Sequence, residues 1–425
     1  MSETDITSLV TGIAQRALET SRQLATLGTE DKNRALRAIA DRLEDPALTK
    51  TVLNANQKDL DAGIAAGLSD AMVDRLRLTP DRMLGMAQGV REVAGLPDPV
   101  GTCLEETTHR TGFILRKIRV PIGVIGIIYE SRPNVTIDCA VLCLKSGNAT
   151  ILRGGKEAFN TNSALMGLIQ DALAEAGLPP DAVQLIPTTD RAAMEALLQA
   201  DQYVHCLIPR GGEGLIRMVS EKARMPVIKH YKGLCHVYVH EDADPSMATD
   251  ILLNAKCQRP GVCNAAETLL VDTTLLETWF EEAARALHEH GVELRLDSPA
   301  ATAIGDTLPW HPATNEDFDT EYLDKILSVK TVSGPKEAID FINAHGSGHS
   351  EAIVTRDDAV AHAFLNGVDA AAVYWNVSTR FTDGYEFGLG AEIGISTDKL
   401  HARGPMGLNE LTSYKFVATG TGQIR

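Results

Sequence analysis

The sequence lacks the features that mark a secreted, membrane or nucleic-acid-binding protein. Its N-terminus, MSETDITSLV, has no basic segment followed by an apolar core, and nowhere do about 18 uncharged apolar residues run together. A formal net charge of -17, from 40 basic and 57 acidic residues, argues against holding nucleic acid or an anionic membrane by bulk electrostatics. We therefore expect a soluble, cytoplasmic chain in which any anionic substrate meets a local basic pocket.

Paired cysteine motifs are also missing. The seven cysteines are an odd number without CxxC spacing, so the sequence favours neither a disulfide framework nor a structural zinc site, and no metal is predicted. Internal repeats, low-complexity tracts and Ser/Gly-rich linkers are absent as well. Reduced thiols are expected, most of them small core residues.

What is present is enough apolar sequence for more than one core, since 44% of the 425 residues are hydrophobic. Residues 6–95 predict helices, with Thr29 as an N-cap and with an apolar face at helical spacing made of Leu36, Ile39, Ala40 and Leu43. Residues 105–120, which follow PDPVG, are rich in Thr, Ile, Arg and Val and predict an extended segment. The last twenty residues predict another.

From Val120 onward, strands alternate with helices. The apolar run VPIGVIGIIYE is typical of a strand buried in a parallel sheet, and four shorter strands are predicted at NATILR, VQLIP, VHCLIP and MPVIKH. A second alternating pattern starts near Asn254, with strands at TLLVD, LSVKTV, EAIVT and AAAVYW. We therefore predict an α/β protein with two doubly wound domains and a small extended element.

The stretch KCQRPGVCNA lies at the junction of the two α/β patterns, where clefts usually form. It places two cysteines beside Lys256 and Arg259 and around a Pro-Gly turn, and neighbouring cations or a helix N-terminus lower the pKa of a nucleophilic thiol. Cys263 follows the turn, at the expected entry of a short helix. Pattern alone leaves Cys257 and Cys263 nearly equal as candidates, and a small buried thiol is the commoner role for either.

Four blocks of sequence resemble the aldehyde dehydrogenase superfamily, and more closely its acyl-phosphate-reducing branch, the γ-glutamyl phosphate reductases. They are QRPGVCN, VPIGVIGIIYESRPNVT, HYKGLCHVYVH and GLGAEIGISTDKLHARGPMGL. The resemblance implies that Cys263 is the nucleophile and that Asn134 donates to the oxyanion, together with the backbone N–H of Cys263. Hydrolytic relatives carry a water-activating glutamate in a Glu-Leu-Gly-Gly pattern, whereas the matching stretch here, KHYKGLCH, has no carboxylate.

The segments that are candidates for cofactor binding match known sequence motifs less well than the cysteine segment does. LIPRGGEG, with Gly211 and Gly212, predicts a strand, a glycine loop and a helix, but it is neither a GxGxxG fingerprint nor a Walker A loop, and an ordinary turn is about as plausible. The resemblance implies that this loop binds the cofactor and that Glu321 holds the nicotinamide ribose. Arg153 and Lys156 match the adenosine-ribose segment, where two cations without a carboxylate favour the 2′-phosphate of NADPH over NADH.

The resemblance implies NADPH-dependent reduction of L-glutamyl 5-phosphate to L-glutamate 5-semialdehyde and phosphate through a Cys263 thioester, the second step of proline biosynthesis from glutamate. Arg132 and Arg259 flank the catalytic residues and are candidates for binding phosphate or the substrate carboxylate. The alternatives are a CoA-linked or simple aldehyde dehydrogenase and, from another class, a catalytically silent assembly protein. The thiol and the cofactor loop are both present, which weighs against the last.

The resemblance also implies a division of the chain into functional parts. Residues 1–104 and 121–254 are expected to form a cofactor-binding domain, residues 255–404 a catalytic domain, and residues 105–120 and 405–425 two oligomerisation arms. Unpaired strand edges of this kind are normally covered by another chain. We therefore expect a homo-oligomer, with glutamate 5-kinase as a candidate partner.

Overall fold

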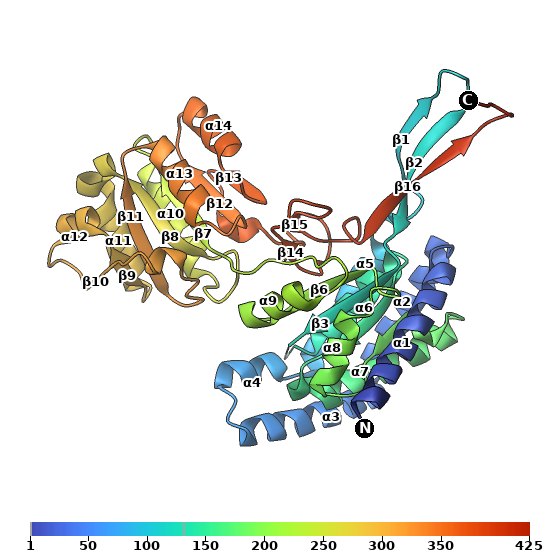
Figure 1. Cartoon of the computed structure of the whole chain (residues 1–425). Coiled ribbons are helices and arrows are strands. Elements are labelled where there is room, and N and C mark those ends of the chain that lie inside the picture. Colours follow the sequence, from blue (N-terminus) through green and yellow to red (C-terminus); the bar gives the residue numbers. More distant parts are fainter. Residues whose placement is uncertain (1, 131) are drawn as a thin grey trace. The chain divides into compact units, whose positions relative to one another are not determined.

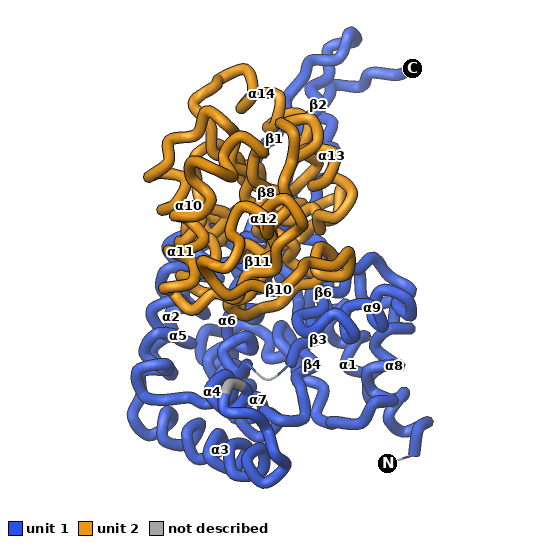
Figure 2. The backbone as a smooth tube through the Cα atoms, turned by 90° about the vertical axis from the view of Figure 1, so that its left-hand side faces the viewer, with its two compact units in different colours: residues 1–229, 388–394, 406–425 blue, residues 230–387, 395–405 orange. Residues whose placement is uncertain are grey.

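The computed structural model of the chain describes residues 2–130 and 132–425. Ser131, within the block around Asn134, lies outside the described residues. The chain divides into two compact units, which Figure 2 shows in blue and orange. Unit 1 comprises Met1–Lys229, Gly388–Gly394 and Met406–Arg425, and unit 2 comprises His230–Phe387 and Ile395–Pro405.

Unit 1 begins with the predicted helical region. Its helices are α1 (Glu3–Leu24), α2 (Thr29–Glu44), α3 (Pro46–Ala65), α4 (Asp70–Leu76) and α5 (Pro80–Gly95). The apolar face predicted on α2 is confirmed, because its four side chains are fully buried. The predicted N-cap is wrong: Gly28 takes that position, and the Thr29 hydroxyl, inside the helix, donates to Asp98 instead.

The sheet of unit 1 is parallel, in the order β5-β4-β3-β6. Its strands are β3 (Val124–Tyr129), β4 (Ala149–Arg153), β5 (Val183–Leu185) and β6 (Cys206–Arg210), and the helices between and after them are α6 (Asn134–Lys145), α7 (Phe159–Glu175), α8 (Arg191–Leu198) and α9 (Glu213–Lys222). The strand order reverses beside β3, which makes the carboxyl edge of β3 and β6 a topological switch point, where ligands of such sheets bind.

The strand predicted at MPVIKH is wrong. Only an isolated bridge joins Val227 to Leu207 of β6, with hydrogen bonds from Leu207 N–H to Pro226 and from Ile228 N–H to Leu207. Pro226 has no N–H to extend a ladder, so the pairing ends after one bridge.

The two extended segments form one small sheet. Strands β1 (Cys103–Thr108), β2 (Ile114–Pro121) and β16 (Thr412–Thr419) pair antiparallel in the order β1-β2-β16, so the C-terminal strand lies beside β2 (Figure 1). All residues of β1 are exposed, and so are the aromatic rings of Tyr414 and Phe416 on β16. The prediction of extended structure is confirmed for both segments, while their role in oligomerisation stays a prediction.

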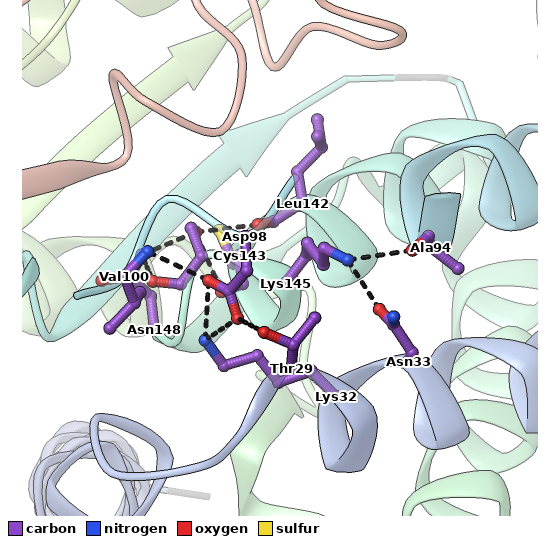
Figure 3. A network of polar contacts seen from close by, with 11 residues as sticks. Thr29, Lys32, Asn33, Ala94, Asp98, Val100, Leu142, Cys143, Lys145 and Asn148 are labelled. Carbon is purple, nitrogen blue, oxygen red and sulfur yellow. Dashed lines mark hydrogen bonds and ion pairs between the residues drawn. The ribbon is translucent and has the colours of Figure 1, made fainter. Parts of the chain in front are cut away.

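A buried polar network joins the helices of unit 1 to its sheets (Figure 3). Lys32 of α2 forms an ion pair with Asp98 at 2.9 Å, and Lys145 of α6 donates to Asn33 at 2.6 Å and to the carbonyl of Ala94. Both lysines are fully buried. The amide of Asn148 donates to the carbonyl of Leu411, which ties the start of β16 to the turn before β4.

Unit 2 is built on a seven-stranded parallel sheet in the order β10-β9-β11-β8-β7-β12-β13. Its strands are β7 (Cys235–Val239), β8 (Ala266–Asp272), β9 (Glu293–Leu296), β10 (His311–Pro312), β11 (Ile326–Val332), β12 (Ser350–Val354) and β13 (Ala372–Trp375), and a separate pair is formed by β14 (Ile395–Ser396) and β15 (Gly404–Pro405). The helices are α10 (Pro245–Cys257), α11 (Glu281–Glu289), α12 (Ser298–Ile304), α13 (Pro335–His345) and α14 (Asp358–Gly367).

The predicted fold class is therefore observed, but one domain boundary differs from the prediction. Unit 2 begins at His230 instead of residue 255, because β7 pairs with β8 and β12 inside the second sheet. The four strands predicted for this unit are present, whereas β7, β9 and β10 were missed. The last two are runs of four and two residues, which carry little periodicity. Among the described residues, no helix is long and apolar enough to cross a bilayer.

Candidate active site

The nucleophile segment is a turn between α10 and β8. Cys257 is the last residue of α10, and Cys263 lies in the turn three residues before β8. The short helix expected after Cys263 is absent from this described segment, because the chain enters β8 at Ala266, which pairs with Cys235 of β7. The side-chain amide of Asn264 donates to the backbone carbonyls of Arg380 and Thr382. The backbone carbonyl of Asn264 accepts a hydrogen bond from the hydroxyl of Thr379.

The two cysteines of this segment have different surroundings. Cys257 packs against the main apolar core of unit 2, and burial raises the pKa of its thiol. Cys263 is half-buried, and its backbone carbonyl accepts a hydrogen bond from the thiol of Cys235 at 3.2 Å. The packing of Cys257 fits a structural thiol, which supports Cys263 as the nucleophile but does not by itself test that role.

Gly233 lies in close contact with the backbone of Cys263. A Cβ atom at Gly233 would collide with the carbonyl group and the Cα of Cys263. The N–H of Gly233 donates to the carboxylate of Glu321 at 2.9 Å, and the ammonium of Lys232 donates to the carbonyl of Asp319. Glu321 therefore helps to fix the loop that supports the candidate nucleophile, Cys263. Its predicted contact with the nicotinamide ribose stays a prediction.

A buried ion pair closes the ends of the nucleophile turn. Lys256, at the end of α10, and Glu267, in β8, are both buried, and their charged atoms lie 2.7 Å apart. Burial raises the pKa of Glu267 to about 7, against the opposing effect of the Lys256 ammonium. The second oxygen of Glu267 accepts from the N–H of Leu323, two residues beyond Glu321. The turn and the Glu321 segment are thus held together.

Arg380 is a cation beside this turn that the sequence reading missed. Its guanidinium donates to the side-chain oxygens of Gln258, at 2.9 Å, and of Asn264, on either side of Cys263. Burial lowers the pKa of Arg380, and the electrostatic neighbours of its guanidinium include Arg259 and Cys263. Two arginines therefore lie near the candidate thiol within unit 2.

In unit 1, Asn134 is the first residue of α6, just beyond β3. Its amide donates to the carboxylate of Asp138, one turn along the helix, at 2.9 Å. Removal from water raises the pKa of Asp138 to about 6, while the Asn134 amide and the Arg210 guanidinium oppose that shift. An amide nitrogen carries two hydrogens, so Asp138 can orient Asn134 and leave one hydrogen for another acceptor. Arg132 is exposed, two residues before α6.

The predicted adenosine-side cations follow β4. Arg153 ends the strand, and its guanidinium donates to the carbonyls of Gly154, at 3.0 Å, and Thr189, at 3.2 Å. Among the described residues the buried Nε of Arg153 has no hydrogen-bond partner. Lys156 is exposed at the start of a short 3-10 helix, Lys156–Ala158. A buried donor next to an exposed ammonium suits an anionic group.

The glycine loop lies between β6 and α9, with Gly212 as the N-cap of the helix. The N–H of Gly212 donates to the carboxylate of Glu130 at 3.0 Å, and a Cβ at Gly211 would lie 2.6 Å from the same carboxylate. Glu130 follows β3, so the helix N-terminus faces an anion from the neighbouring strand. A dinucleotide phosphate would compete with Glu130 for this N–H.

Each unit brings some of the predicted residues together. In unit 1, the segments of Asn134, Arg153 and Gly212 all follow the carboxyl ends of β3, β4 and β6. In unit 2, Gly233 connects Glu321 to Cys263. The sequence reading missed Glu130, Asp138, Gly233, Glu267 and Arg380. The spacing of Asn134 and Asp138 on one helix was a usable signal, whereas Arg380 lies more than a hundred residues from its partners.

Three comparisons place these features among known proteins. The sequence model described as the aldehyde dehydrogenase family matches residues 6–306 and 312–417. A γ-glutamyl phosphate reductase from Opitutus terrae is 59% identical over 423 residues, which are 99% of this chain and 99% of that protein. One from Carboxydothermus hydrogenoformans is 56% identical over 416 residues, 98% and 99% of the two chains. The crystal structure of γ-glutamyl phosphate reductase from Thermotoga maritima is 43% identical, has a TM-score of 0.95, and the match covers 98% and 99% of the two chains.

Proposed function

The chain belongs to the aldehyde dehydrogenase family, and from that premise we propose that it reduces L-glutamyl 5-phosphate to L-glutamate 5-semialdehyde and phosphate, the second step of proline biosynthesis from glutamate. The observation that carries this activity is 59% identity to a γ-glutamyl phosphate reductase over 99% of the chain. The chain is an oxidoreductase that acts on a small-molecule substrate.

The chemistry of the proposed reaction centres on Cys263. Its thiolate attacks the acyl carbon, the phosphate group leaves with the electron pair of the broken C–O bond, and a thioester remains on the sulfur. After reduction, collapse of the thiohemiacetal releases the aldehyde and restores the thiolate. Asn134 and the N–H of Cys263 are the proposed donors to the oxygen that becomes negative, and one such donor contributes about 10²–10³ in rate.

The thioester has to survive until it is reduced. The stretch 229–236 supplies no carboxylate to activate water, and the Gly233 that it contains is used to support the Cys263 backbone. A water nucleophile is therefore poorly supplied, which suits transfer of the acyl group to a reductant or, in reverse, to phosphate.

The family is one of nicotinamide-dinucleotide enzymes, and the residues after β4 fit the phosphorylated form. When bound, NADPH would supply the reducing equivalent that converts the thioester to the aldehyde. Arg153, whose buried Nε has no hydrogen-bond partner within residues 2–130 and 132–425, and the exposed Lys156 would hold the 2′-phosphate. Gly211 and Gly212 would face the pyrophosphate after Glu130 gives up the Gly212 N–H, and Glu321 would hold the nicotinamide ribose.

Arg132 and Arg259 remain candidates for binding the anionic groups of the substrate. Both are exposed, and Arg259 is an electrostatic neighbour of Arg380. Guanidinium groups suit bidentate contacts with phosphate or carboxylate.

The activity is tested in the reverse direction. The purified chain is incubated with NADP, phosphate and L-glutamate 5-semialdehyde, and formation of NADPH is followed by absorbance. We expect NADPH to form only when phosphate is present. Formation without phosphate, or with CoA in its place, would instead identify a simple or CoA-linked aldehyde dehydrogenase.

The three-stranded sheet is the proposed site of self-association, and glutamate 5-kinase is a further candidate partner. Tyr414 and Phe416 expose about half or more of their side chains, at 51% and 61%, on β16 of this sheet. Light scattering should show a homo-oligomer for the native chain and a smaller species for Phe416→Glu. Leu400→Glu, at a position 88% exposed outside the sheet, is the control. A monomeric native chain would exclude this role.

A further inference from the structure

Unit 2 contains a cavity of about 660 Å³ between α10 and the loop after β13. Gln258 and Arg380 line it, so it opens beside the nucleophile turn, and Ile251 and Val377 give it apolar surface. This volume is in the range of small-molecule sites.

Arg380 offers positive charge in this cavity. The two side-chain acceptors of its guanidinium, on Gln258 and Asn264, are neutral amide oxygens, so these two hydrogen bonds do not neutralise its charge. Both amides belong to the segment that carries Cys263, with Asn264 directly after the cysteine. An anion bound by Arg380 would therefore be held in a fixed relation to the thiol.

The same cavity also contains negative charge. Asp250, Asp383 and Glu386 line it, and Asp383 is an electrostatic neighbour of Arg380. Three carboxylates would repel a dianionic phosphate, whereas a group with both a carboxylate and an ammonium complements both signs. The lining therefore favours a zwitterion over a simple anion.

We propose that this cavity binds the α-amino-acid end of the substrate, with Arg380 on the α-carboxylate, with Asp383 and its acidic neighbours on the α-ammonium, and with Ile251 and Val377 along the methylene chain. The assignment rests on the proposed function and adds to it a basis for substrate selection. It leaves the phosphate group to other cations, of which Arg132 and Arg259 are candidates.

The carboxylate contact is tested with Arg380→Gln, and with Arg380→Lys as the charge-conserving variant, in the phosphate-dependent oxidation of L-glutamate 5-semialdehyde. A hydrogen bond to a charged group contributes about 1.5–3 kcal/mol, so the KM for the semialdehyde should rise about 10- to 100-fold in Arg380→Gln, less in Arg380→Lys, and the KM for phosphate should stay the same. A rise in the KM for phosphate instead would assign Arg380 to the phosphate and overturn the proposal.

The ammonium contact is tested with a substrate pair, because a merely structural effect of a variant would change both substrates alike. The native chain should prefer L-glutamate 5-semialdehyde to 5-oxopentanoate, which lacks the amino group. The double variant Asp383→Asn, Glu386→Gln should lose about 10-fold or more of this preference, measured as the ratio of kcat/KM for the two substrates. An unchanged preference would refute the ammonium site.

Failure of this inference differs from failure of the proposed function. A native chain that does not oxidise the semialdehyde with phosphate would refute the function itself. A native chain that is active, with variants that keep the native KM and the native preference, would refute only the assignment of the cavity.

Discussion

In unit 1 the candidate functional groups follow the carboxyl ends of neighbouring parallel strands, whereas in unit 2 a single turn carries the thiol and distant segments hold it in place. The unit 1 groups are exposed or half-buried and sit within a few residues of β3, β4 and β6. The turn of unit 2 is held by a buried ion pair, a glycine contact and an arginine from the far end of the sequence.

This difference predicts how each site responds to the substitution of one residue. At the edge of unit 1, each candidate group has only one or two polar partners, such as Asp138 for Asn134, so a replacement should affect one group and its direct partner. In the turn of unit 2, the backbone of Cys263 is fixed by several contacts at once, so a small displacement should affect the chemical step. A misplacement of about 1 Å can cost on the order of 10²-fold in rate.

The largest effect is expected from the thiol. Cys263→Ala should lower kcat by about 10⁴-fold or more, because the covalent step then has no nucleophile. Steady-state reduction of the acyl phosphate measures the loss. The matched control is Cys257→Ala, six residues earlier, half-buried and packed against the core, which should keep most of the activity. An inactive Cys257 variant with an active Cys263 variant would reverse the assignment.

A smaller effect is expected from the glycine that supports the thiol. Gly233→Ala should lower kcat by about 100-fold, because the new Cβ collides with the backbone of Cys263 and displaces it. The control is Gly89→Ala in α5, where a Cβ meets no neighbouring atom within 4 Å. Native-like kcat in Gly233→Ala would show that the turn can shift without loss of chemistry.

The next effect is expected from Asp138 and depends on pH. With a pKa of about 6, Asp138 is ionised at neutral pH and orients the Asn134 amide, so Asp138→Asn should lower kcat about 10-fold. In the native chain kcat should fall as pH drops through about 6, and the variant should lack this limb. The folding stability should depend on pH in the opposite direction to kcat, because burial raises the pKa of Asp138 in the folded state. Its contribution to stability is present at low pH and is lost as pH rises through about 6. A limb that persists in the variant belongs to another group.

The smallest effect is expected from the cations after β4. Arg153→Gln with Lys156→Gln should raise the KM for NADPH about 10-fold and leave the KM for NADH nearly the same, since only NADPH carries a 2′-phosphate. Initial rates with both cofactors measure this, with Lys222→Gln on exposed α9 as the control for loss of surface charge. Equal changes for both cofactors would remove the proposed role.

The sequence by itself determined the fold class, the helical start of the chain and the extended segments, because these follow from local periodicity and composition. The four short blocks that resemble the aldehyde dehydrogenase superfamily also indicated the family, because candidate site residues such as Cys263 lie within contiguous motifs. Even so, the predicted catalytic domain began at residue 255, whereas unit 2 begins at His230, because β7 joins the second sheet by long-range pairing with β8 and β12 that local periodicity does not indicate.

Only the tertiary structure decided how the thiol is supported. Gly233, Glu267 and Glu321 surround one turn, and Arg380 joins the turn from the loop after β13. No periodic pattern in the sequence indicates these contacts, because each depends on which parallel strands become neighbours and on which loops then meet at the ends of those strands. Both cysteines are half-buried, but tertiary packing gives them different neighbours that the local sequence did not indicate: Cys257 packs against the main apolar core of unit 2, whereas the carbonyl of Cys263 accepts a hydrogen bond from the thiol of Cys235.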